Sequence, residues 1–453
     1  MQVTETLTEG LKREFKVVVP AAELDERLTT RLATLKDEVR IKGFRPGKVP
    51  VSHLRRLFGK STMAEIVQGL ISEVARNTLS ERGERAAMQP DFELPEDQTE
   101  AERVLLGEAD LAYTMRYEIL PAVELKDYKT ISIERPIAEV SDEQVDTELK
   151  RLAESTRTFT AKEGKSADGD RLTIAYVGKI DGEPFEGGSD DNAVIRLGSS
   201  RFIPGFAEQL AGLSAGEEKT ISVTFPEDYG AAHLAGKAAT FDVTVREVAG
   251  PDALAIDDEL AKRLGLESLD QLRDAVRQQI QSQYGQATRQ KVKRQMLDQL
   301  DTLHSFDLPP TMVEQEFENI WRQITGEMTQ SGRTFESEET TEEAARADYR
   351  KIAERRVRLG LVLSQIGEAN SIQVTEEEVQ RALAAQLRQF PGREQVLVEY
   401  YRTNPGAVAG LRAPIFEEKV VDFLMELVKV TDKTVSPEEL LKEEEEEDAA
   451  SQA

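Results

Sequence analysis

One short segment of the sequence combines an aromatic side chain with several cations in a rigid turn. Residues 43–50 read GFRPGKVP, and their two glycines and two prolines oppose a helix and favour an exposed loop. In this loop Phe44 offers apolar contact area, and Arg45 can pair bidentately with a carboxylate or a phosphate group. Residues 36–60 hold eight Lys or Arg and two acidic residues, a net charge of +6. The pattern predicts a docking loop, although its charge alone would also fit a solvated basic turn.

The composition excludes several other kinds of chemistry. The 453 residues include no cysteine, which excludes disulfides, thiolate nucleophiles and cysteine-based zinc sites. The three histidines lie far apart in the sequence and lack the spacing of a metal site. We therefore expect neither a metal nor a cofactor.

The overall charge argues against a protein that coats a polyanion. The sequence has 58 Lys and Arg against 85 Asp and Glu, which gives −27 at pH 7. Binding DNA or an anionic membrane with the whole surface would need net positive charge at the contact. The N-terminus has no signal-peptide pattern, and no apolar run reaches the ~18 residues of a spanning helix. We expect a cytoplasmic protein with no DNA partner and no membrane partner, in which the basic loop is a local exception.

The elements that would position this loop indicate a multidomain α+β fold. Glycine and β-branched residues dominate residues 165–247, and helical periodicity covers almost everything from 257 to 430. The predicted strands are 15–19, 111–120, 170–180, 217–225 and 239–248. The predicted helices are 22–39, 62–82, 141–157, 268–304, 310–328, 340–369, 375–390 and 413–430, and those beginning near 141, 268, 340 and 375 open on a Ser/Thr-x-x-Gln/Glu capping box. This predicts an N-terminal α+β domain, a middle antiparallel β domain with one short helix and an all-α C-terminal domain.

The loop string resembles the ribosome-docking signature of the bacterial trigger factor family. In that family the motif lies at the tip of a helix–loop–helix and contacts ribosomal protein and RNA near the polypeptide exit. Pro46 stands where family members often have a lysine. The resemblance implies that the ribosome is bound by Gly43, Phe44, Arg45, Pro46, Gly47 and Lys48.

An ordered set of glycines and aromatic residues resembles an FKBP-type peptidyl-prolyl isomerase domain. The set runs from Tyr176-x-Gly178 through IPGF at 203–206 to Phe241-x-Val243. That fold is a curved antiparallel sheet over one helix, with an aromatic-lined pocket between them. The resemblance implies catalytic roles for Tyr176, Phe185, Glu186, Ile203, Phe206, Tyr229 and Phe241, and pocket contacts for Phe202 and Leu234. Three positions depart from the family pattern: Glu186 replaces a common Asp, Phe206 a common Trp, and Ala193 an aromatic residue.

The implied reaction suits such a pocket. An X–Pro bond isomerises slowly because amide resonance must be broken, against a barrier of ~18–20 kcal/mol. The twisted transition state is less polar than the planar amide, so a dry apolar pocket can favour it without a nucleophile or a metal. For any single ring, ordinary core packing is the alternative, and we expect it for Phe225.

Both resemblances together divide the chain into five parts. These are a ribosome-binding α+β domain at 1–120, a linker strand and helix at 121–160, an FKBP-type domain at 161–249, a helical chaperone domain at 250–435 and an acidic disordered tail at 436–453. The expected function is that of a ribosome-associated chaperone. It would hold nascent and unfolded polypeptides in an open state, aid their export and isomerise their X–Pro bonds.

Two other functions compete with this interpretation. One is a free prolyl isomerase whose helical domain selects substrates without ribosome docking. The other is a nucleic-acid-binding protein, which is disfavoured because one short loop is too small for a broad basic face. The sequence leaves open whether the free protein forms a homodimer.

Overall fold

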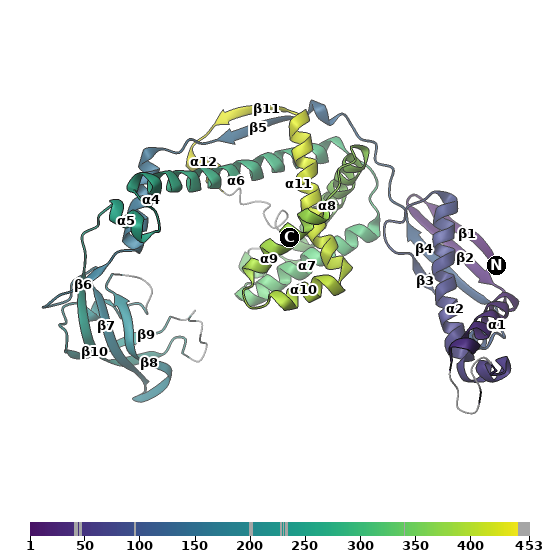
Figure 1. The fold of residues 1–453 in the computed structure, drawn as a ribbon, viewed down its shortest axis with the longest axis horizontal. Helices are drawn as coiled ribbons and strands as arrows, with labels where there is room; N and C mark the ends of the chain where they lie inside the picture. The colour runs from purple at the N-terminus through teal and green to yellow at the C-terminus, as the bar shows by residue number, and fades with distance from the viewer. Residues whose placement is uncertain are drawn as a thin grey trace. The chain divides into compact units, whose positions relative to one another are not determined.

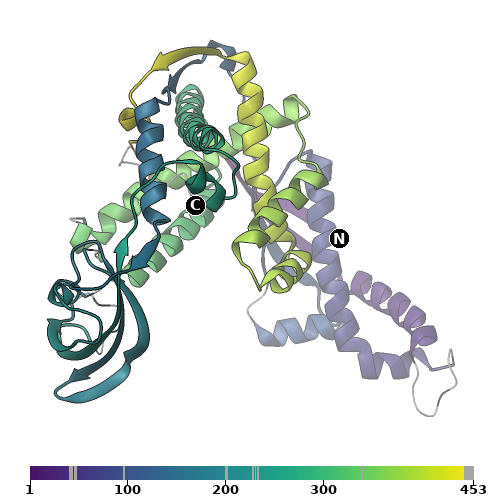
Figure 2. The ribbon, with the colours of Figure 1, turned by 60° about the vertical axis from the view of Figure 1, so that its left-hand side comes forward.

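The computed structural model describes residues 1–39, 44, 48–94, 97–198, 203–226, 229, 231, 234–338 and 340–442, apart from the side chains at 338 and 405. The chain forms two compact units. One combines Met1–Pro136 with Thr288–Ala453, and the other consists of Ile137–Ala287. Figure 1 and Figure 2 trace the chain through the helices and strands of both units. Within the described ranges, no helix is both long and apolar enough to cross a membrane.

The first unit begins with a four-stranded antiparallel sheet packed against helices (Figure 1). The strand order is β1-β2-β4-β3. The bounds are β1 (Gln2–Glu9), β2 (Lys12–Val19), β3 (Asp91–Glu93), β4 (Leu111–Glu118), α1 (Ala21–Glu38), α2 (Val51–Arg82) and α3 (Gln98–Leu106). The alternation predicted for β4 is confirmed, because Leu111, Tyr113 and Met115 are buried in one core with Leu24 and Leu28 of α1.

Two features of this domain differ from the prediction. Helix α2 begins at Val51 rather than at 62, because Leu54 is fully buried and the first turns already pack into the core. Strand β1 was not predicted at all, since each of its eight residues is exposed and no alternation marks it. Consequently α1 ends at Glu38, before residues 43–50, and α2 begins at Val51, directly after them.

The rest of the first unit is mainly helical. Its elements are α7 (Pro310–Ser331), η3 (Glu336–Glu338), α8 (Glu342–Ala369), α9 (Glu376–Gln389), α10 (Glu394–Thr403), α11 (Pro405–Leu427) and α12 (Pro437–Leu441). The segment before the second unit contributes η1 (Tyr128–Thr130) and β5 (Ser132–Ile137), and β5 pairs with β11 (Lys429–Thr434). The core joins Met296 and Leu300 of α6 (Leu269–Leu303) with Val362 of α8 and Leu424 of α11.

Several predicted boundaries in this region are corrected. The N-cap of α8 is Thr341, whose side chain accepts from the Ala344 amide, and not Thr340. The last predicted helix, 413–430, is the end of α11 as far as Leu427, and its last two residues belong to β11. Helix α11 begins at 405 and holds Pro414 in its interior, and α10 was not predicted. The expectation of disorder from 436 onward is wrong for α12, which is capped by Ser436 and buries Leu440. Residues 443–453 lie outside the described residues.

The second unit contains an antiparallel sheet in the order β6-β10-β7-β8, with β9 paired to β10. Its elements are β6 (Phe159–Ala161), β7 (Arg171–Ile180), β8 (Glu183–Arg196), η2 (Glu208–Leu210), β9 (Glu218–Thr224) and β10 (Ala238–Pro251). Beside them, α4 (Asp142–Ser155), α5 (Asp258–Arg263) and the first half of α6 share a separate core around Leu149 and Leu260. The capping box predicted at Ser141 and Gln144 is confirmed. Together the two units confirm the multidomain α+β class.

Candidate functional site

Aromatic rings from separate segments meet on the inner face of the sheet in the second unit. Phe241 of β10 lies at the centre, and its ring centroid is 5.2 Å from Phe206, 5.8 Å from Tyr176 and 6.1 Å from Phe185. The interplanar angles of these pairs are 82°, 64° and 90°. This is the edge-to-face geometry that aromatic pairs prefer. Tyr176 of β7, Phe185 of β8 and Phe206 before η2 are thus joined by one ring into an apolar wall.

Exposure rises from one side of this aromatic cluster to the other. Phe241, Phe206 and Phe225 are only 2–3% exposed, and Phe225 is buried as expected for a core residue. The Phe225 ring centroid lies 4.7 Å from that of Tyr229, with the rings tilted by 56°, and Tyr229 is 39% exposed. Tyr176, Phe185 and Ile203 are partly buried, and Leu234 is buried. The cluster therefore combines buried rings, which we call its floor, with partly exposed rings, which we call its rim.

Two glycines make room for the Phe185 ring. A Cβ atom on Gly178 would lie 2.6 Å from the Phe241 ring and 2.8 Å from the Phe185 ring. A Cβ atom on Gly188 would lie 2.7 Å from the Phe185 ring. Any larger residue at either position would push Phe185 out of the cluster. This gives a physical reason for the glycine in the Tyr176-x-Gly178 motif.

The carboxylate opposite Tyr176 in the sheet is that of Asp190, which no sequence motif marks. Asp190 is paired with Tyr176 in the β7–β8 ladder, and both Asp190 and Glu186, the carboxylate implied by the family resemblance, are exposed. Burial raises the pKa of the Tyr176 hydroxyl, and the Asp190 carboxylate and Tyr229 raise it further. The ladder has register shifts on both sides of Tyr176, between Ile174 and Tyr176 and between Val177 and Lys179. Sequence reasoning missed Asp190 because such bulges decide which residue faces which.

The docking loop lies between the end of α1 and the start of α2. Phe44 is 39% exposed, and its ring centroid lies 5.2 Å from that of His53 in the first turn of α2. Lys48 is also exposed. The remaining residues predicted for docking or for the pocket lie outside the described residues, namely Gly43, Arg45, Pro46, Gly47 and Phe202.

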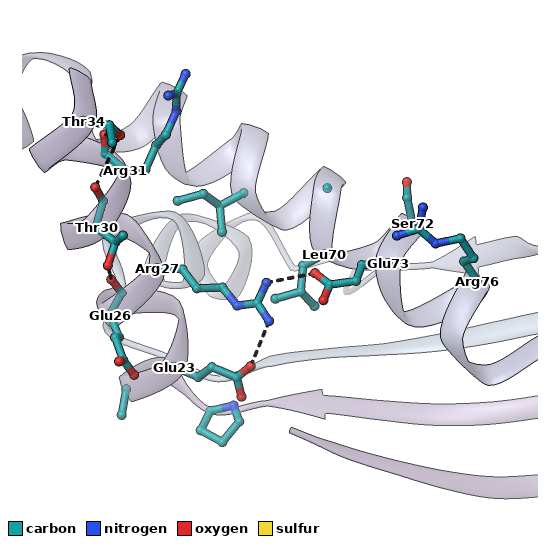
Figure 3. A pocket seen from close by; sticks show the side chains of 14 residues that line it. Glu23, Glu26, Arg27, Thr30, Arg31, Thr34, Leu70, Ser72, Glu73 and Arg76 are labelled. Carbon is teal, nitrogen blue, oxygen red and sulfur yellow. Dashed lines mark hydrogen bonds and ion pairs between the residues drawn. The ribbon is translucent and has the colours of Figure 1, made fainter. Parts of the chain in front are cut away.

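A groove of about 1210 Å³ lies between α1 and α2 (Figure 3). Figure 3 shows Arg27 reaching across it, with its guanidinium 3.0 Å from Glu73 and 3.4 Å from Glu23. The hydrogen bond that Arg27 donates to the Glu73 carboxylate raises the pKa of Arg27. The lining contains three arginines and three glutamates. Its charges therefore balance, and the groove does not extend the positive character of the basic loop.

Three family comparisons cover most of the chain. Residues 1–152 match the family described as bacterial trigger factor protein, and residues 268–426 match the family of its C-terminus. Residues 162–246 match the FKBP-type peptidyl-prolyl cis-trans isomerase family. Both resemblances seen in the sequence are thereby confirmed.

Individual proteins agree with the family matches. The trigger factor of Brucella abortus (strain S19) is 60% identical over 443 residues, which cover 98% of this chain and 94% of that protein. The trigger factor of Allorhizobium ampelinum is 58% identical over 445 residues, which cover 98% and 90%. A solved trigger factor chaperone has a TM-score of 0.55 at 18% identity, covers 94% of this chain and 99% of its own, and supports the fold. The chain belongs to the bacterial trigger factor family, ribosome-associated chaperones with an FKBP-type prolyl isomerase domain.

Proposed function

We propose that the chain docks on the ribosome through the loop between α1 and α2, and that it isomerises X–Pro bonds in the aromatic cluster around Phe241. Its partners would be ribosomal protein and RNA near the polypeptide exit, together with nascent and unfolded chains whose export it also aids. The observation that carries the isomerase site is the ring cluster, which combines a buried floor with an exposed rim.

In this proposal the rings act by excluding water. A prolyl residue would pack against Phe241 and Phe206, where the twisted amide loses less solvation than the planar amide does. At the rim, the Tyr176 hydroxyl is neutral, as an ordinary phenol is near pH 7, and burial raises its pKa further, so it can donate a hydrogen bond to a peptide carbonyl. Phe185 closes one side of the pocket. Its ring occupies the room that Gly178 and Gly188 leave because they have no Cβ atom.

Docking would use the exposed ring of Phe44 together with the cations beside it. An aromatic ring that leaves more than a third of its surface in water has apolar area to offer to a partner. Lys48 and the arginine after Phe44 can pair with phosphate or carboxylate groups. The acidic remainder of the chain would limit other contacts with RNA.

The docking proposal is tested by replacing Phe44, Arg45 and Pro46 with alanine in the full chain. Co-sedimentation with vacant and translating ribosomes at moderate salt should fall at least tenfold, a change of about 1.4 kcal/mol for a docking ring and an arginine. The matched control Lys150→Ala/Arg151→Ala removes two positive charges from the exposed face of α4 and should leave binding unchanged. Equal ribosome binding by the loop variant would overturn the docking proposal and favour the free isomerase.

The isomerase site is tested separately with Tyr176→Ala/Phe241→Ala. This variant should lose isomerisation of a prolyl reporter peptide, because it removes the centre and the rim of the cluster together. Suppression of aggregation of a proline-poor unfolded client should persist. If that suppression were lost while the helical part stayed folded, the chaperone and isomerase sites would not be separate.

A further inference from the structure

We infer that Gln209 is a positioning residue of the isomerase, which holds the two central rings of the pocket at their working separation. Gln209 lies in η2, three residues after Phe206, and is partly buried. It lies outside the motifs that identify the pocket. The inference rests on the pocket proposed above.

The side-chain amide of Gln209 bridges two segments of backbone. Its Nε2 atom donates to the carbonyl oxygens of Gly205 and Ser222, each at 2.8 Å. The Ser222 amide in turn donates to Oε1 at 3.4 Å. A glutamine amide has two N–H donors, and here each donor has its own carbonyl acceptor. A carboxylate in this place could donate to neither.

One bridged segment leads into Phe206, and the other is β9, which pairs with β10, the strand that carries Phe241. Gly205, which directly precedes Phe206, has a left-handed φ of +83°, so this backbone turns sharply just before the ring. Ser222 directly follows Ile221, which is paired with Phe241 across β9 and β10. Gln209 therefore ties the backbone just before Phe206 to the strand that pairs with the strand of Phe241, and the two ring centroids are 5.2 Å apart.

A second contact holds η2 against the same strand. The Lys219 ammonium donates to the main-chain oxygen of Gln209 at 2.6 Å. Lys219 and Ser222 both belong to β9, so the main chain and the side chain of Gln209 are fixed to one strand. Glu208, the neighbouring residue in η2, is exposed and serves as a control.

This arrangement matters because the proposed pocket acts through the positions of its rings and through the exclusion of water. A small displacement of a group that contacts the reacting bond can slow a reaction strongly even when the fold is kept. Gln209 would not contact the substrate. It would act by fixing the position of the Phe206 ring relative to the Phe241 ring. Its loss should therefore weaken transition-state stabilisation more than ground-state binding.

The test measures kcat and KM for a prolyl reporter peptide with the full chain. Gln209→Ala should lower kcat about three- to tenfold, as expected for lost hydrogen bonds, and should leave KM nearly unchanged. Gln209→Glu should be slower still, because its carboxylate would face two carbonyl oxygens. Glu208→Ala should match the unaltered protein, and Gln209→Met keeps the side-chain volume without donors if the alanine variant fails to fold.

A double-mutant cycle with Phe206→Leu separates positioning from general stability. If Gln209 acts through Phe206, then Gln209→Ala should cause no further loss of kcat in the Phe206→Leu background. Fully additive losses, or an unchanged kcat in the single variant, would overturn the inference while leaving the pocket proposal intact. If Phe206→Leu itself had full activity, the proposed pocket would fail instead.

Discussion

Two phenylalanines mark the contrast between the two sites of this protein. Among the described residues, Phe241 is 3% exposed and has four aromatic neighbours, whereas Phe44 is 39% exposed and has the single ring of His53 beside it. The first ring lies in a strand with partners on both sides, and the second lies in a loop between two helices. The same residue type thus occurs in one preassembled site and in one site that an external partner would complete.

The difference shows where each site obtains its order. The sheet of its own domain positions the aromatic cluster, so the packing of these rings contributes to the folding free energy of that domain. The Phe44 ring leaves apolar area in water, which a ribosomal partner would cover under the docking proposal. Mutations should therefore separate the two sites by their effect on stability as well as on activity.

The largest expected effect comes from Phe241→Ala compared with Phe44→Ala. Deleting the buried ring leaves a cavity and should cost about 3–5 kcal/mol of unfolding free energy. Removing the exposed ring should change stability by less than about 0.5 kcal/mol. Urea unfolding, monitored by hydrogen exchange of the β7 and β10 amides, measures the stability lost in Phe241→Ala without interference from the other unit. Equal costs for the two variants would remove the distinction between a preassembled site and a partner-completed one.

A smaller effect is expected when a methyl group is added under the Phe185 ring. Gly188→Ala should cost about 1–3 kcal/mol through overpacking and should lower isomerase activity, because the new Cβ would lie 2.7 Å from that ring. Unfolding midpoints and reporter turnover give the two readouts.

Two further variants sharpen this prediction. Adding Phe185→Leu to Gly188→Ala should recover part of the lost stability, since a smaller side chain leaves room for the methyl group. Gly285→Ala, which faces open space in α6, should cause no loss. If Gly188→Ala were as stable as Gly285→Ala, the close packing of the Phe185 ring against Gly188 would be disproved.

The sequence predicted elements well where a pattern could be counted. The capping boxes at Ser141 and Thr375 and the alternation of β4 are confirmed, because each depends on neighbours close in sequence. Strand β1 gave no signal because it forms an exposed edge. The start of α2 was missed because its first turns carry basic residues that resemble a continued loop, although Leu54 is buried there. Tertiary contacts decided both.

The same distinction applies to the site residues. Tyr176, Phe206 and Phe241 were selected on family motifs, and the structure brings their rings together. Asp190 and Gln209 could not be selected, since their positions depend on strand register and on a turn with a left-handed glycine. Motifs therefore predicted the aromatic rings of the site, whereas the polar residues beside them are identified by the three-dimensional structure.

The smallest effect concerns the carboxylate at the rim of the pocket. Burial, Asp190 and Tyr229 raise the pKa of Tyr176, so its hydroxyl loses its proton at higher pH in the folded chain than in the unfolded chain. The resulting stability is present below the unfolded pKa of about 10 and is lost as pH rises through the folded pKa. Asp190→Asn should lower the pKa of Tyr176, because it removes a negative charge opposite the ring. Glu186→Gln should leave the pKa of Tyr176 unchanged. Tyrosinate absorbance, taken as the difference from Tyr176→Phe in each background, measures it. If Glu186→Gln lowered that pKa and Asp190→Asn did not, the family's carboxylate position would be the one that faces Tyr176, and the aligned register of β7 and β8 would be wrong.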